Sequence, residues 1–64
     1  MDGRDRKNIK AGTTVDIVLK EHQRSGTLTR GTVVNILTKS SFHPHGIKVR
    51  LDSGLVGRVK KILD

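Results

Sequence analysis

The chain has 64 residues, with 13 Lys+Arg against 6 Asp+Glu, a formal net charge of +7. It has no cysteine and no apolar stretch of membrane-spanning length, which excludes disulfide staples, thiolate zinc sites and a transmembrane helix. A chain this short forms one domain, and without staples or a signal-like N-terminal run we expect it to be cytoplasmic, with no membrane partner, and monomeric.

The positive charge predicts attraction to polyanions, of which nucleic acid is the most abundant in a cytoplasm. Phe42 is the one aromatic residue. This scarcity disfavours the base-stacking platforms of single-strand binders and the aromatic grooves that hold proline-rich peptides. Contact through phosphates, or through the shape of RNA, stays open.

At the N-terminal end, we expect residues 1–8 to form a flexible basic arm and residues 9–63 to form the compact domain. One helical or 3₁₀ turn is expected near residues 8–11, with Gly12 closing it. The basic side chains of this arm would tether phosphates, and the plainer alternative is a solvated tail.

Residues 13–20 predict the first strand, because Val15, Ile17 and Leu19 alternate with other side chains. A polar loop follows, in which Gly26 is expected to take a positive φ. Residues 32–38 predict the second strand. Neither of its two alternating sets of side chains is cleanly polar, which indicates a bulge or burial on both faces.

Residues 39–45 form a loop that contains Pro44, and a β-hairpin follows from residue 46 to residue 59. Its turn is Asp52-Ser53-Gly54, with Gly54 in the left-handed region. This turn sets Lys48 opposite Arg58. Like charges facing each other across strands are unfavourable, so we interpret this pair as kept for an anionic partner.

Residues 60–64 either form a helical turn or extend the last strand. The pattern gives four strands, or five with a short one near Leu28 or Ile62. Short antiparallel strands with glycine-marked turns and no long helix predict an all-β fold, a small SH3-like barrel.

Two family resemblances support this expectation. The first rests on Gly12, Val15, Ile17, Gly26, Gly31 and Val33, and is similar to the opening strands and loop of KOW-type domains. Those are SH3-like barrels of ribosomal proteins and transcription elongation factors, and the resemblance implies contact with RNA or protein.

The second resemblance covers nearly the whole chain. Its blocks are Arg6-x-x-Ile9-x-x-Gly12, Gln23-Arg24-Ser25-Gly26-x-Leu28-Thr29-x-Gly31, Ile36-Leu37-Thr38 and His43-Pro44-His45-Gly46-Ile47-Lys48-Val49-Arg50-Leu51. They resemble the YwbE-like family of small basic proteins. This resemblance implies a compact domain and no particular mechanism.

The three histidines, His22, His43 and His45, have three interpretations. Neutral imidazoles suit zinc, copper or nickel. The plainer interpretation, which we favour, is a rigid loop whose rings bond to backbone or face solvent. In a third interpretation, His43 and His45 donate to phosphate when protonated. We therefore expect no metal site.

The segment from residue 23 to residue 31 has the donors of a phosphate-binding loop but lacks the P-loop lysine and spacing. A polar hairpin turn explains it equally well. No pair of acids and no serine stands in a recognisable catalytic pattern. We therefore expect no enzyme activity and no cofactor.

The sequence thus predicts a small RNA-binding domain that contacts phosphates. Lys48, Arg50 and Arg58 form the predicted centre, Arg24, Arg30 and Lys60 extend it, and His43 and His45 border it. The first alternative is an interaction module that docks on an acidic protein partner. The second is a metal-binding accessory protein that uses the histidines.

Overall fold

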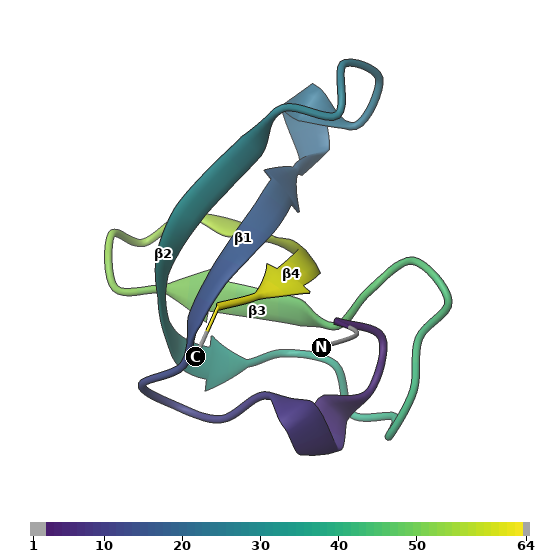
Figure 1. The fold of residues 1–64 in the computed structure, drawn as a ribbon, viewed down its shortest axis with the longest axis vertical. Helices are drawn as coiled ribbons and strands as arrows, with labels where there is room; N and C mark the ends of the chain where they lie inside the picture. The colour runs from purple at the N-terminus through teal and green to yellow at the C-terminus, as the bar shows by residue number, and fades with distance from the viewer. Residues whose placement is uncertain (1–2, 64) are drawn as a thin grey trace.

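The structure, a computed structural model, describes residues 3–63. In that range four antiparallel strands close into a barrel in the order β1-β2-β3-β4 (Figure 1). The elements are η1 (Arg6–Asn8), β1 (Thr14–Leu19), η2 (Lys20–His22), β2 (Leu28–Ile36), β3 (Lys48–Leu51) and β4 (Val56–Ile62), η1 and η2 being single 3₁₀ turns. The predicted all-β class and small antiparallel barrel of SH3-like type are confirmed.

Alternation along β1 builds one wall of the core. Val15 and Ile17 are 0% exposed, and Leu19 is buried beside them. Successive side chains of a strand point to opposite faces, so these three turn inward together. The interior is almost entirely Val, Leu and Ile; the buried cluster is Ile9, Val15, Ile17, Leu19, Val33, Ile47, Val49, Leu51, Val59 and Ile62. Each fully buried side chain of this kind contributes roughly 1.5–3 kcal/mol.

The second strand is longer than predicted, because the segment from Leu28 joins it without a break. Its pairing with β3 shifts register between Val33 and Asn35, as a β-bulge does. Val33 is buried, Val34 and Asn35 are both exposed, and Ile36 turns back toward the core. The predicted bulge is confirmed, and it explains why neither set of alternating side chains was cleanly polar.

A second register shift lies between β1 and β4. Asp16 pairs with Lys61 and Ile17 pairs with Val59, which leaves Lys60 as the extra residue on β4. Lys60 and Lys61 are consequently both exposed, while Val59 and Ile62 are both buried. Lys60, Lys61 and Ile62 extend the last strand, so the alternative of a helical turn there is wrong, and Asp64 lies outside the described residues.

The register of the β3–β4 hairpin is confirmed. Lys48 pairs with Arg58 and Val49 with Gly57. The Leu51 amide donates to the Leu55 carbonyl at 2.8 Å across the turn. Gly54 has a φ of 90°, as the three-residue turn requires.

The described part of the predicted arm is not free. The Ile47 amide donates to the Gly3 carbonyl and the His43 amide to the Arg4 carbonyl, both at 2.9 Å. The Arg6 amide donates to the Ser41 carbonyl at 2.8 Å. Residues 3–6 therefore lie along the 41–47 segment, in place of the flexible arm expected from composition. Residues 1 and 2 of that arm lie outside the described residues.

The helical turn near the N-terminus begins two residues earlier than expected, at Arg6, and Gly12 follows it with a φ of 95°. No helix in the described part of the chain is long and apolar enough to cross a lipid bilayer.

Candidate nucleic-acid interface

A row of side chains crosses the outside of the barrel from β1 to β3. Val18 of β1 pairs with Arg58 of β4, and Arg58 pairs in turn with Lys48 of β3. Because the core residues Ile17, Val49 and Val59 are their immediate chain neighbours and point inward, these three side chains point outward. The strands thus place two cations side by side on one outer face.

Two adjoining hollows lie over this row. One, of about 400 Å³, is lined by Val18, Gln23, Gly26, His45, Arg58 and Lys60. The other, of about 440 Å³, is lined by Val18, Lys20, Gln23, Lys48, Val56, Gly57 and Arg58. They share Val18, Gln23 and Arg58, so they form one continuous depression. We call it the basic groove.

Two loops form the sides of the basic groove. The β1–β2 loop contributes Gln23, and the loop between β2 and β3 contributes His45. The left-handed Gly26, with a φ of 71°, helps the β1–β2 loop to turn, as predicted. Three separate stretches of the chain therefore meet around Arg58.

Backbone carbonyls hold the two groove-lining cations of β4 in place. Arg58 Nη1 donates to the Gly46 carbonyl at 3.2 Å, and Lys60 Nζ donates to the His45 carbonyl at 3.1 Å. A guanidinium has five N–H donors and an ammonium three, so each retains donors for a ligand. These bonds orient the cations without neutralising their charge.

Arg30 behaves differently. Its Nε donates to Asp16 Oδ1 at 3.1 Å. The side chain of Arg30 is 67% exposed, whereas that of Asp16 is 9% exposed. This hydrogen bond, and then the attraction between the charges, raises the pKa of the Arg30 guanidinium above its ordinary value. Arg30 lies outside the groove and is compensated by the protein itself.

His43 and His45 form a small unit in the loop beside the groove. The His45 amide donates to His43 Nδ1 at 3.2 Å, and the two ring centroids are 5.8 Å apart. Desolvation, then the charge of Arg58, then His45, lower the pKa of His43 below its ordinary value of 6.5. A neutral His43 ring fits its role as an acceptor, so at neutral pH this ring adds no charge to the groove.

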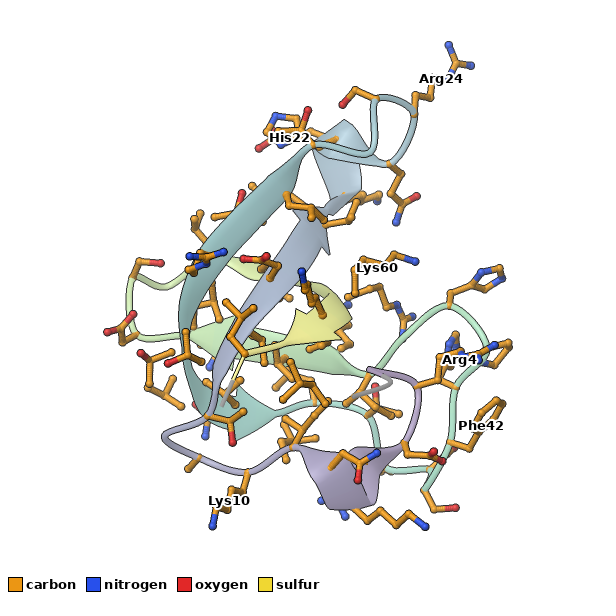
Figure 2. All side chains as sticks on the ribbon, viewed as in Figure 1. Arg4, Lys10, His22, Arg24, Phe42 and Lys60 are labelled. Carbon is orange, nitrogen blue, oxygen red and sulfur yellow. The ribbon has the colours of Figure 1, made fainter. Side chains whose placement is uncertain are left out.

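A metal centre finds no support in the described residues. His22 lies on η2, which directly follows β1, and Figure 2 shows it on the opposite side of the β1–β2 loop from Arg24. Within residues 3–63, no group of three or more His, Asp or Glu side chains is placed to hold a metal ion.

The structure therefore brings together part of the predicted site. Of the predicted residues, the groove is lined by Lys48, Arg58, Lys60 and His45. Arg50 lies on the same face of β3, opposite Val56, but does not line the groove. Arg24 extends from the tip of its loop (Figure 2).

Sequence reasoning missed two lining residues with polar side chains, Lys20 and Gln23. Lys20 continues the outward alternation of Asp16 and Val18, so the strand pattern contained a signal for it. Gln23 had no such signal, because only the fold of the β1–β2 loop brings it next to Arg58.

Comparison with known proteins places the chain among its relatives. Residues 2–62 match the family described as "Uncharacterized conserved protein (DUF2196)". The chain belongs to this family. It is also 60% identical over 63 residues to "Uncharacterized protein YwbE" of Bacillus subtilis (strain 168), covering 98% of this chain and 97% of that protein. The predicted membership in a YwbE-like family is confirmed. No solved structure gives a significant match.

Proposed function

We propose that this DUF2196 protein binds structured RNA in the cytoplasm, with a stretch of sugar–phosphate backbone lying in the basic groove. One observation carries the proposal. Lys20, Lys48, Arg58 and Lys60 line a continuous depression, and none of the described residues that line it is acidic.

Physical reasoning supports a backbone ligand over a base-reading one. Phosphates accept hydrogen bonds from lysine and arginine, and their binding releases the counterions condensed on the nucleic acid. The groove offers charge and donors beside Val18, and no Phe, Tyr or Trp is among its lining residues. Such a site binds with little sequence preference and with strong dependence on salt.

The register of the hairpin adds to this argument. Lys48 and Arg58 pair directly, although like charges at this separation repel. The ion pair between the side chains of Arg30 and Asp16 lies on another part of the surface. A polyanion in the groove would relieve the repulsion between Lys48 and Arg58.

Fluorescence anisotropy with a short, blunt RNA duplex tests the proposal. If three phosphates are neutralised, affinity should fall about 40-fold between 50 and 200 mM salt. A DNA duplex of the same sequence tests preference for the A-form helix. Absence of binding at low salt, or binding insensitive to salt, would refute the proposal.

A matched pair of variants locates the contact. Lys60→Gln removes a cation of the groove, and Lys10→Gln removes one near the bottom of the molecule in this view, away from Lys60 (Figure 2). We expect Lys60→Gln to lower the salt slope by about one and Lys10→Gln to leave it unchanged. Equal effects of the two substitutions would mean that RNA binding depends on the net charge of the protein and not on the basic groove.

A further inference from the structure

The basic groove continues beyond Lys60. A third hollow, of about 160 Å³, is lined by Gly3, Arg4, Pro44, His45, Gly46, Val59 and Lys60. It shares His45 and Lys60 with the groove, so the cationic lining extends toward Arg4. Figure 2 shows Arg24, Lys60, Arg4 and Phe42 following one another down the same side of the molecule in this view.

Phe42 lies where this lining ends. Its side chain is 49% exposed, although it is the chain's one aromatic residue. Its backbone is held on both sides, by the bond from the Arg6 amide to Ser41 and by the bond from the His43 amide to Arg4. The ring is thus presented to solvent on a fixed backbone and is no part of the buried core.

The surroundings of the ring are polar. Its chain neighbours are Ser41 and His43, and Asp5 faces it across an isolated antiparallel bridge. Directly paired residues of such a bridge project to the same side. A carboxylate at this point disfavours a phosphate but offers an acceptor to the amino group of a base. A wholly apolar partner surface fits this setting less well than a flat ring with polar edges.

We propose that Phe42 stacks one unpaired nucleobase at the end of the basic groove, so that the protein prefers RNA with an unpaired nucleotide beside a duplex. This inference rests on the proposed function, since the phosphates of that strand lie in the groove. Stacking on an aromatic ring is sequence-tolerant, because every base has a π-face. A single ring serves a single base, which agrees with the scarcity of aromatics in the chain.

The test compares two RNAs that differ by one nucleotide. One is the blunt duplex, and the other carries a single-nucleotide overhang made of a fluorescent adenine analogue. We expect the overhang to raise affinity about 5-fold or more. We also expect the fluorescence of the analogue to be quenched on binding.

Phe42→Leu and Phe42→Tyr separate stacking from simple apolar contact. Phe42→Leu should remove the preference for the overhang and the quenching, and leave affinity for the blunt duplex unchanged. Phe42→Tyr, which keeps a ring, should retain both effects.

Each other outcome is informative. Equal binding of the two RNAs by the unmodified protein, or a preference that survives Phe42→Leu, overturns the stacking proposal while the groove proposal stands. Failure of both RNAs to bind overturns both proposals.

Discussion

Arg30 and Arg58 occupy equivalent kinds of position, yet they differ in what faces them. Each is an arginine on the outer face of a barrel strand. Arg30 of β2 pairs with Asp16 of β1 and bonds to its carboxylate. Arg58 of β4 pairs with Lys48 of β3 and, among residues 3–63, bonds to a backbone carbonyl in place of a carboxylate. Because the two residues are of the same type, it is the residue facing each of them across the strands that decides which arginine is available to a ligand.

The difference separates two uses of charge in this small protein. The charges of Arg30 and Asp16 stabilise the fold, whereas those of Arg58 and Lys48 remain available for binding. The carboxylate of Asp16 is mostly buried, so its ion pair with Arg30 satisfies a group that the fold has removed from water. Opposed cations such as Lys48 and Arg58 destabilise a sheet slightly, by roughly 0.2–1 kcal/mol. Net charge alone does not distinguish these two regions.

Charge reversal at Lys48 should have the largest effect. Lys48→Glu removes one phosphate contact and supplies a carboxylate opposite Arg58, so two contacts weaken together. We expect affinity for the RNA duplex to fall roughly 30-fold, if each of these two solvent-exposed ionic contacts contributes about 1 kcal/mol. Anisotropy titrations measure this loss.

The folded state should not suffer from this change. The introduced carboxylate faces Arg58 and replaces repulsion with attraction, so the unfolding temperature of Lys48→Glu should stay equal or rise slightly. Lys10→Glu is the control with the same change in net charge. If it weakens RNA binding as much as Lys48→Glu does, the groove is not the binding site.

Removal of the ion pair between Arg30 and Asp16 should lower stability and leave RNA binding nearly unchanged, the reverse of the effects expected for Lys48→Glu. The double variant Asp16→Asn with Arg30→Gln leaves the net charge unchanged and removes the ion pair. Because Arg30 is exposed, we expect the unfolding temperature to fall by roughly 4 °C or less. Affinity for the RNA duplex should stay within about twofold of the unmodified protein. A large loss of affinity would mean that Arg30 contacts RNA after all.

Acidification should give the smallest effect, through His43. Its pKa in the folded protein is lowered by desolvation, Arg58 and His45, whereas an unfolded histidine keeps a value near 6.5. The unfolded chain therefore binds more protons as the pH falls below 6.5. This contribution to the free energy of unfolding is fully present above pH 6.5 and declines as the pH falls from there toward the folded pKa.

Urea unfolding at a series of pH values, with the unmodified protein and His43→Gln, measures this contribution as the difference between the two curves. The difference should shrink on acidification. A second check is the imidazole titration by NMR, in which Arg58→Gln should move the pKa of His43 back toward its ordinary value. An unchanged titration would show that Arg58 does not act on this ring.

Part of the candidate site followed from local pattern. The opposition of Lys48 and Arg58 depends only on strand alternation and on a three-residue turn that needs Gly54 in the left-handed region. Lys60 follows from the same alternation, because it shares the outward parity of Arg58, whereas the bulge on β4 is the reason that Lys61 is exposed beside it. The placement of Arg30 outside the groove did not follow from the sequence, because its pairing with Asp16 joins two strands whose register the sequence did not specify.

The sequence by itself determined the all-β class, the inward alternation of β1 and the register of the β3–β4 hairpin. These features depend on a two-residue period and on turn chemistry, which act over a few neighbouring residues. Tertiary structure alone decided the position of the β4 bulge, the docking of residues 3–6 and the placement of Gln23 in the same groove as Arg58. Each of these depends on contacts between segments far apart in the chain, and barrel closure sets their geometry.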